Sequence, residues 1–369
     1  MIHIIANGSI RRSSRDNAVK AIEDGLFQEV VFMDYSVSIS VVMSSYNTEL
    51  SMLKEAVESI LNQTFRDFEF LIIDDGSTDG SDQYLKSLSD ERVKIIQNPQ
   101  NIGITKSLNI GFKAAKGKYI ARMDADDISL PTRFEKQYAY MEAHPEVIVC
   151  GTRAGILDEK RNVRPLNVNV PENMEEYRVR MIFLNPGPTH PTAFFRHEKL
   201  LEYHILYDEK LIYAQDYGMW EVVSRYGKVS SLDEVLLYRR KHEKQISIAK
   251  RDVQKKCDKM TQKKILSDLL GSVSDEEVEL HYTHSTGYNQ DATISPEVAA
   301  WYDRLLQANQ SRHIYEQKIL QKFVSLIKKR LVLQTIKQNQ NLSKYEKTRL
   351  FFRYLPFLSA VKTILLSDT

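Results

Sequence analysis

Apolar and polar positions along the first two thirds of the chain alternate between two spacings. Four segments have the length and apolar content of strands: 39–43, 68–74, 93–97 and 118–123. Between them, apolar side chains recur at helical spacing over 49–62, 81–88 and 105–115. Strands and helices that alternate at this length predict a parallel, doubly wound α/β sheet. A further helix is expected over 217–226.

The two ends of the chain have different patterns from this middle part. Residues 1–37 predict a small α/β preface, with strands over 2–6 and 28–33 and a helix over 16–24. After residue 249 the pattern is helical over 251–270 and 296–337, with a polar, irregular stretch over 271–293. His281 and His284 in that stretch are expected at the surface, because no carboxylate or Cys stands at ligand spacing. Three regions are therefore predicted: 1–37, 38–249 and 250–369.

Charge is distributed unevenly between the last region and the rest of the chain. The net charge of +2 combines about +9 over residues 311–369, where twelve Lys and Arg face three acidic residues, with about −7 elsewhere. The aromatic and apolar residues over 350–366 are too interrupted to span a bilayer, and favour an amphipathic anchor on a membrane surface. The alternative is packing on the region over 38–249 or on a second subunit of a homo-oligomer. Nucleic acid is not an expected partner, because no recognised binding module accompanies the charge.

Cysteine content and the amino terminus bear on the compartment. Cys150 and Cys257 are the only cysteines, which excludes a disulfide framework and a Cys-based zinc site and favours a reducing cytoplasm. The first residues lack a basic region followed by a long apolar one, and no run of eighteen apolar residues occurs. We therefore expect a cytoplasmic protein, peripheral on the inner face of the membrane if the anchor operates.

Three carboxylates follow the predicted strand over 118–123, in Asp124-Ala125-Asp126-Asp127. Carboxylates this close repel one another unless they are solvated or a cation lies among them. Ligand sites in open α/β sheets lie beyond the carboxyl ends of strands, which favours a site for Mg²⁺ or Mn²⁺. A solvated acidic loop is the alternative interpretation.

A second polar group follows the strand over 68–74, in Asp74-Asp75-Gly76-Ser77. A carboxylate at this position can accept hydrogen bonds from a ribose or a base, although the same residues also suit a turn that caps the next helix. The segment 111–118 fails as a P-loop, because it has one residue too many between its glycines and ends in Tyr119. No Gly-x-Gly-x-x-Gly occurs, which disfavours dinucleotide redox chemistry.

Taken together, the ordered motifs resemble family 2 inverting glycosyltransferases of the GT-A fold, over about residues 38–247. The resemblance is strongest to bacterial enzymes that add single sugars to lipopolysaccharide or capsule oligosaccharides, such as lipooligosaccharide N-acetylglucosaminyltransferases. It is carried by Val41-Val42-Met43-Ser44-Ser45-Tyr46-Asn47, Ser59-Ile60-Leu61-Asn62-Gln63-Thr64-Phe65, Ile73-Asp74-Asp75-Gly76-Ser77-Thr78-Asp79-Gly80-Ser81, Asn101-Ile102-Gly103 and Asp124-Ala125-Asp126-Asp127.

Three downstream segments extend the resemblance to the acceptor side. They are Thr189-His190-Pro191-Thr192-Ala193-Phe194-Phe195-Arg196, Gln215-Asp216-Tyr217-Gly218-Met219-Trp220 and Tyr238-Arg239-Arg240-Lys241-His242-Glu243-Lys244-Gln245-Ile246-Ser247. The resemblance implies Asp216 as catalytic base, with His190, Gln215 and Trp220 on the acceptor side. Gln215 replaces the family's first acid, which puts a second carboxylate contact in doubt. From the residues alone, Asp216 reads as a helix cap and Trp220 as packed core.

The resemblance also implies a GT-A catalytic region, with a Rossmann-like, mostly parallel central sheet, followed by a helical C-terminal extension. Transfer of a hexose or N-acetylhexosamine from a UDP-sugar to an oligosaccharide or lipid-linked acceptor is the implied reaction. Asp126 and His242 would bind Mn²⁺ or Mg²⁺, Asp124 would face the ribose, and Asp75 would bind uracil or ribose. The rest of the nucleotide site would comprise Ser45, Tyr46, Asn47, Asp74, Asn101 and Gly103. A sugar nucleotidyltransferase and a non-catalytic scaffold subunit are the alternatives.

Overall fold

The computed structural model describes residues 35–166, 168–242, 250–286, 289 and 291–355, and the backbone of three strands before residue 35. The chain divides into two units, Met1–Val170 with Gly187–Arg251, and Pro171–Pro186 with Asp252–Thr369. The helix expected over 16–24 and residues 356–366 of the expected anchor lie outside the described residues.

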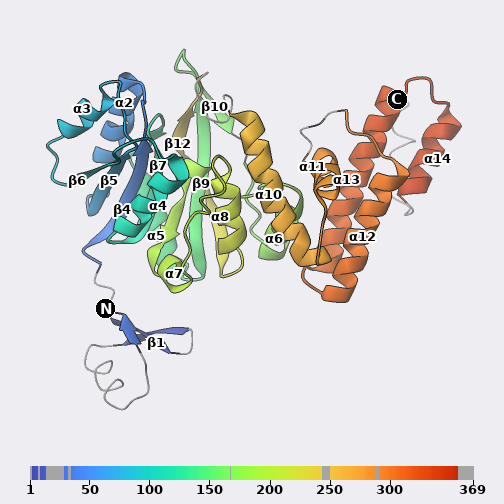
Figure 1. Ribbon diagram of the computed structural model, residues 1–369, viewed down its shortest axis with the longest axis horizontal. Helices are drawn as coiled ribbons and strands as arrows, with labels where there is room; N and C mark the ends of the chain where they lie inside the picture. Colours follow the sequence, from blue (N-terminus) through green and yellow to red (C-terminus); the bar gives the residue numbers. More distant parts are fainter. Residues whose placement is uncertain are drawn as a thin grey trace. The chain divides into compact units, whose positions relative to one another are not determined.

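A nine-stranded sheet forms the centre of the first unit (Figure 1). Its strands are β4 (Val37–Ser45), β5 (Phe68–Asp74), β6 (Val93–Gln97), β7 (Gly117–Asp124), β8 (Ile128–Ser129), β9 (Val147–Leu157), β10 (Val163–Leu166), β11 (Phe194–Arg196) and β12 (Lys228–Arg240). They lie in the order β6-β5-β4-β7-β11-β9-β12-β8, and β10 pairs with β9. Strands β6, β5, β4 and β7 are parallel, whereas β11 runs antiparallel to both β7 and β9.

Helices of the first unit follow most of these strands. They are α2 (Leu50–Leu61), α3 (Ser81–Lys86), α4 (Ile104–Ala114), α5 (Arg133–Ala143), α7 (His197–Glu202) and α8 (Gln215–Val223), with a short 3₁₀ turn, η1, over His190–Thr192. Every residue of β5 is buried, and α2 buries Leu53, Ala56, Val57 and Ile60 at helical spacing. These side chains enter one apolar core with residues of β4, β5 and β7. Burial of this stripe, rather than helix propensity, stabilises α2.

The predicted α/β class is therefore found, and the four strands read from the apolar pattern form the parallel half of the sheet. The remaining strands, β8 to β12, were not predicted, and the apolar runs in β9 and β12 are interrupted by polar residues. Arg153 and Thr152 in β9, for example, interrupt its pattern. The sheet-forming partners of these strands lie far away in the chain, and β12 pairs with β9 through three register shifts.

A separate three-stranded antiparallel sheet precedes the main one, in the order β2-β1-β3. Its strands are β1 (Ile2–Ala6), β2 (Ser9–Ser13) and β3 (Glu29–Val31). Strands near 2–6 and 28–33 were expected, whereas Ser9–Ser13 was not. Its central Ile10-Arg11-Arg12 has one apolar residue, so the segment lacked a readable strand period.

The second unit is helical among the described residues. It contains α6 (Met174–Phe183), α10 (Arg251–Leu270), α11 (Asp275–Ser285), α12 (Pro296–Arg312), α13 (Gln317–Gln338) and α14 (Lys344–Tyr354). Two expectations were wrong here. The stretch expected to be irregular contains α11, which begins with a Ser274–Glu277 capping box. The segment expected to be helical over 296–337 is broken at His313, which has a φ of 53°.

The expectation that His281 is a surface residue was also wrong. His281 is fully buried, and its Nε2 donates to the carbonyl of Ile182 at 2.8 Å. Its Nδ1 accepts from Trp301 Nε1 at 3.0 Å, so the geometry requires the neutral Nε2–H tautomer. His281 thus joins α6, α11 and α12, and α6 belongs to this unit although it interrupts the first one in sequence.

Candidate active site

The polar residues predicted for the site meet at one edge of the sheet because their strands are parallel neighbours. Ser45, at the end of β4, is in register with Asp74 of β5, and Ser44 is in register with Asp124 of β7. The turns that follow these three strands therefore lie side by side. This is the edge at which open α/β sheets bind ligands.

Asn47 connects the turn after β4 to the turn after β5. Its side-chain oxygen accepts from Thr78 N at 2.8 Å, and its backbone N–H donates to Ser77 Oγ at 3.0 Å. Asn47 has a φ of 45°, a conformation that Asn tolerates better than most residues. Ser45 is buried beside Thr48, whereas 48% of Tyr46 is exposed, which leaves its ring accessible to a planar ligand.

Asp74 and Asp75 are both 1% exposed and accept hydrogen bonds from protein groups. Asp74 accepts from Ser77 N and from Gln97 Nε2. Asp75 accepts from Asn98 Nδ2 at 2.8 Å, and from the backbone N–H groups that precede α4: Ile102 at 3.0 Å and Gly103 at 2.9 Å. The structure thus turns Asp75 toward the segment 98–103, and Asn101 in that segment is exposed. The Asp75 carboxylate holds this segment in place, a role that the sequence did not reveal.

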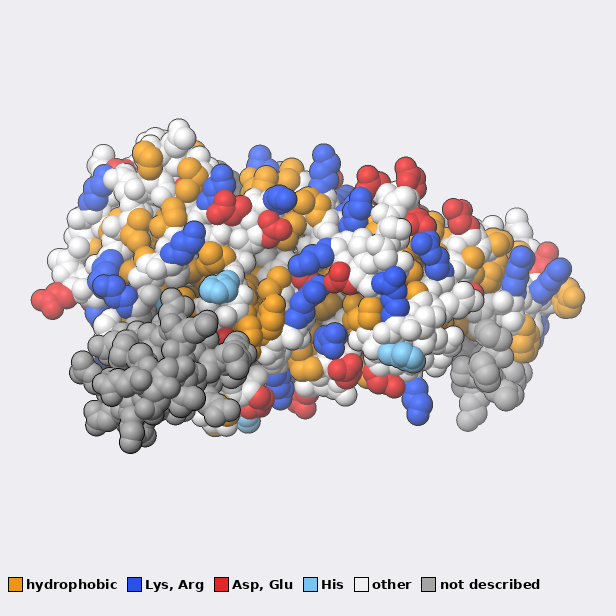
Figure 2. All heavy atoms as spheres, turned by 60° about the horizontal axis from the view of Figure 1, so that its bottom comes forward, with side chains coloured by type: hydrophobic (Ala, Val, Ile, Leu, Met, Phe, Trp, Pro, Cys, Tyr) orange, Lys and Arg blue, Asp and Glu red, His pale blue; other side chains and the backbone are white. Residues whose placement is uncertain are grey.

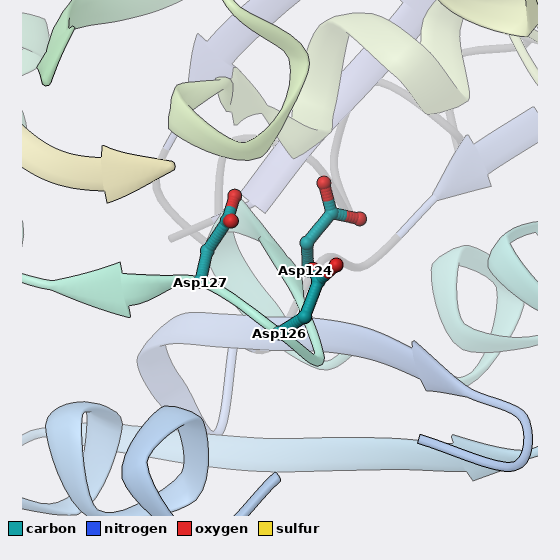
Figure 3. A group of neighbouring side chains, drawn as sticks. All are labelled: Asp124, Asp126 and Asp127. Carbon is teal, nitrogen blue, oxygen red and sulfur yellow. The ribbon is translucent and has the colours of Figure 1, made fainter. Parts of the chain in front are cut away.

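Asp124, Asp126 and Asp127 form an acidic cluster on the turn after β7 (Figure 3). One carboxylate oxygen of each lies within 4.8 Å of the others. Burial, together with the charges of Asp126 and Asp124, raises the pKa of Asp127 well above its usual value. Burial also raises the pKa of Asp124, although Arg122 opposes this shift. Asp127 Oδ2 is buried and has no partner among the described residues. An unpartnered carboxylate oxygen among three carboxylates suits a hard divalent cation.

His242 lies directly after β12 and contacts this cluster. Its Nε2 is 2.8 Å from Asp126 Oδ2. The structure therefore brings together the two residues predicted to bind metal, although 116 positions separate them. The carboxylate oxygens suit Mg²⁺ or Mn²⁺, and an imidazole nitrogen is a common ligand of divalent first-row metals.

Two arginines at the acidic cluster were missed by sequence reasoning. Arg122 of β7 is buried and forms an ion pair with Asp124, and its Nε and Nη1 have no partner among the described residues. Arg240 donates its backbone N–H to Asp127 Oδ1 at 2.9 Å and its Nε to the Asp126 carbonyl at 2.9 Å. The signal for Arg122 was its place two residues before Asp124, since alternate strand residues share one face of a sheet.

Asp216 is the second residue of α8, half-buried at the amino end of that helix. The cap position is Ala214, without a side-chain cap, so the interpretation of Asp216 as the cap was wrong. A carboxylate in the first turn is stabilised in its ionised form by the helix dipole. Gln215 beside it is 6% exposed. Of the two motif positions, 215 and 216, only Asp216 therefore provides an accessible carboxylate.

His190 contacts Tyr207, with its Nε2 2.8 Å from the Tyr207 hydroxyl. Burial, with Arg122 as a nearby cation, lowers the pKa of His190 well below its usual value, so the ring is neutral. Burial raises the pKa of Tyr207, and the charges of Asp216 and Asp124 add to the shift. Tyr207, which sequence reasoning missed, therefore lies within electrostatic reach of both the acidic cluster and Asp216.

Trp220 is not available to an acceptor in this structure, because it is fully buried. Its indole stacks on Phe195 with ring centroids 5.9 Å apart, and a Cβ on Gly187 would lie 2.1 Å from its Cδ1. The structure therefore corrects the acceptor-side assignment of Trp220 and agrees with the interpretation as packed core.

Comparisons with known proteins decide the family. The family model described as glycosyl transferase family 2 matches residues 40–204. An uncharacterized glycosyltransferase of Methanocaldococcus jannaschii is 37% identical over 204 residues, which are 54% of this chain and 69% of that protein. The chain belongs to glycosyl transferase family 2. The amylovoran biosynthesis glycosyltransferase AmsE of Erwinia amylovora is 33% identical over 210 residues, 54% of this chain and 74% of AmsE.

Solved structures show the fold that this family 2 member adopts. Residues 1–349 of TarS from S. aureus, in complex with UDP-GlcNAc, align with a TM-score of 0.55 at 18% identity, covering 87% of this chain and 93% of that chain. The prediction of a GT-A fold with a helical C-terminal region is confirmed, as is the prediction that the chain is a glycosyltransferase.

Proposed function

We propose that this family 2 glycosyltransferase transfers a hexose or N-acetylhexosamine from a UDP-sugar to a hydroxyl of a glycan or lipid-linked acceptor, with inversion, in the synthesis of a bacterial surface polysaccharide. The observation that carries the proposal is the acidic cluster at the end of β7, beside the polar turns after β4 and β5. The relative AmsE, an amylovoran biosynthesis glycosyltransferase, supports the product class. The TarS complexes with UDP-GlcNAc and UDP support the donor class.

Inversion requires a single displacement at the anomeric carbon. The acceptor oxygen forms the new bond to that carbon while the bond to the diphosphate breaks, and UDP departs with the bonding electrons. The acceptor proton moves to the carboxylate of Asp216, which must be ionised and within about 3 Å of the hydroxyl. Position in the first turn of α8 favours the ionised form.

The nucleotide end of the site is the set of turns after β4 and β5. Tyr46 would stack on uracil, and the loop that Asp74, Asp75 and Asn47 hold together would offer backbone groups to the base and ribose, with Asn101 and Gly103 at its edge. Asp124, held by Arg122, would accept from a ribose hydroxyl. These roles use hydrogen-bonding groups or an aromatic face.

The acidic cluster and His242 fit a divalent cation. Asp126 and His242 would hold Mn²⁺ or Mg²⁺, and such an ion neutralises charge that develops on a diphosphate leaving group. The unpartnered Oδ2 of Asp127 supports the fit, because an isolated buried carboxylate oxygen is costly without a cation or a donor.

We further propose that the helical unit lies on an anionic membrane surface. Among the described residues no helix combines the length and the apolar content needed to cross a bilayer. On the face shown in Figure 2, basic and acidic side chains are interspersed. Helix α13 differs, because its sequence contains no acidic residue. One outward stripe of α13 has spacings of three and four residues: Lys322, Leu326, Lys329, Leu333 and Lys337.

The test is UDP release from a panel of UDP-sugars, with Mn²⁺ present or chelated, for the wild type and for Asp216→Asn. Metal-dependent release from one donor in the presence of an oligosaccharide or lipid-linked acceptor, lost in the variant, is the expected result. Pyrophosphate release from a sugar phosphate and UTP would instead indicate a nucleotidyltransferase. UDP binding without turnover on any acceptor would indicate a scaffold subunit.

A further inference from the structure

Helix α4 is tied at its amino end to the nucleotide side of the site. Gly103, with a φ of 92°, precedes the helix, and its N–H binds Asp75 Oδ2. Asn98 Nδ2 also donates to Asp75 Oδ1 at 2.8 Å and to Ser107 Oγ of α4 at 3.1 Å. Asp75 and Asn98 therefore connect the segment 98–103 to the first turn of α4.

Side chains of α4 also form hydrogen bonds to the segment 203–214, which connects α7 to α8. Asn109 binds both backbone groups of Tyr207, accepting from its N–H at 2.9 Å and donating to its carbonyl at 3.0 Å. One turn earlier, Thr105 Oγ1 donates to the Leu211 carbonyl at 2.9 Å. Both side chains are nearly fully buried, at 2% and 3% exposed. The segment contains no helix or strand, so these hydrogen bonds to α4 fix its conformation.

Helix α4 has little freedom to shift, because it lies directly on the sheet. A Cβ on Gly111 would be 2.4 Å from Val42 Cγ1 of β4 and 2.7 Å from Ile73 Cδ1 of β5. On the other side, Phe112 packs edge-to-face on the Tyr207 ring, with centroids 5.1 Å apart. The helix is therefore a rigid element between the donor-side loops and the segment that leads to Asp216.

We propose that Asn109 is a positioning residue, which places Asp216 and the Tyr207 hydroxyl through the segment 203–214. Through α4, the conformation of the segment 98–103 is coupled to the position of the catalytic base, Asp216. The inference rests on the proposed function, in which Asp216 is the base. The Asp216 carboxylate needs precise placement, because displacing a proton acceptor by about 1 Å can lower the rate on the order of 100-fold.

The test compares Asn109→Leu, which at similar volume removes the two bonds to Tyr207 and a longer one to Glu209 Oε1, with Asn109→Asp, which keeps the bond from the Tyr207 N–H. Asn341→Leu, at an exposed position of the helical unit, is the matched control. For Asn109→Leu we expect kcat to fall about 100-fold, while the Kd for UDP with Mn²⁺, measured by calorimetry, stays within about 2-fold. Asn109→Asp should recover part of kcat, and the control should match the wild type.

Hydrogen exchange provides a readout that does not depend on turnover. Amides of 203–214 should exchange faster in Asn109→Leu, and UDP with Mn²⁺ should slow their exchange in the wild type but not in the variant. If Asn109→Leu does not fold, Thr105→Val, which replaces a hydroxyl by a methyl, takes its place. Unchanged kcat, or an equal loss of kcat and UDP affinity, would overturn the inference while leaving the transferase proposal intact. A wild type that releases no UDP would overturn the transferase proposal, and hydrogen exchange would still test whether Asn109 holds the segment 203–214.

Discussion

His242 Nε2 lies 2.8 Å from Asp126 Oδ2, and this contact places the second residue after β12 against the turn after β7. If His242 is a ligand as proposed, His242→Ala should raise the Mn²⁺ concentration needed for half-maximal UDP release by about 10-fold or more, because one of the proposed ligands is lost. Saturating Mn²⁺ should restore much of the rate. His144→Ala, at an exposed His beside Glu146, is the control. Equal Mn²⁺ dependence in the two variants would exclude His242 as a ligand.

Asp127, the third carboxylate of the acidic cluster, should destabilise the metal-free protein. Asp127→Asn keeps an oxygen to accept from Arg240 N and removes the buried charge. Because burial and two neighbouring carboxylates raise the folded pKa of Asp127, its contribution to stability is present at low pH and lost as pH rises. With chelator present, we expect the variant to unfold about 2 °C or more above the wild type at pH ~8, and by less at pH ~6.

If the cluster binds Mn²⁺ as proposed, the same Asp127→Asn variant should lose part of the stabilisation that Mn²⁺ confers on the wild type, since one carboxylate charge of the cluster is gone. Asp233→Asn, at a largely exposed carboxylate paired with Arg153, is the control. A lower unfolding temperature for Asp127→Asn with chelator would mean that the carboxylates are adequately compensated by Arg240 and Arg122 alone.

The helical unit should lose stability as pH falls below about 6.5, because His281 is buried as the neutral ring. Burial lowers its pKa to about 4, so the unfolded state binds the proton first as pH falls. The stabilisation is complete above pH ~6.5 and is lost progressively down to pH ~4, up to about 3 kcal/mol. Protonation of His281 Nδ1 would also place its N–H opposite the Trp301 Nε1–H, so that two donors face each other and the hydrogen bond is lost.

This loss can be measured by fluorescence, because the chain has two tryptophans and each unit holds one. In a Trp220→Phe background, Trp301 reports the helical unit alone. Denaturant unfolding followed between pH ~4 and pH ~7 should show a steep dependence, and His281→Gln, which keeps a donor and an acceptor without titrating, should flatten it. Equal slopes for the two proteins would assign the pH dependence to other groups.

Binding to anionic vesicles should depend on the outward stripe of α13. Leu326 and Leu333 are 52% and 43% exposed within that stripe. Combined Lys322→Glu, Lys329→Glu and Lys337→Glu should weaken binding to phosphatidylglycerol vesicles by about 100-fold, since each Lys near such a surface contributes about 1 kcal/mol. Sedimentation with vesicles is the measurement, and neutral phosphatidylcholine vesicles should bind neither protein.

The control for α13 carries the same charge change in the first unit, as Lys86→Glu, Lys160→Glu and Lys210→Glu. It should bind vesicles like the wild type, apart from the general effect of net charge. Equal losses in the two triple variants would assign the attraction to overall charge. If neither wild type nor control binds, and the wild type forms a concentration-dependent oligomer that the α13 variant does not, the stripe is a subunit contact.

Local information was enough for the parallel half of the sheet and for the polar residues at its edge. Strands β4, β5 and β7 are buried on both faces, so their apolar runs are continuous and readable. Parallel strands end at one edge, and this alone places Ser45, Asp74 and Asp124 together. The acidic cluster, the Asp216 motif and the family were therefore determined by the sequence.

Only the tertiary structure decided the partners of these residues. Asn109 and Tyr207 are 98 positions apart, and His242 and Asp126 are 116 apart, so no local period predicts either contact. Burial was also decided by packing. Asp75 turned toward the segment 98–103, and His281 became a buried hydrogen-bonding residue of a helical unit that includes α6 from the middle of the chain. A hydrogen bond depends on where two backbones cross in space, and that crossing is set by the whole fold rather than by neighbouring residues.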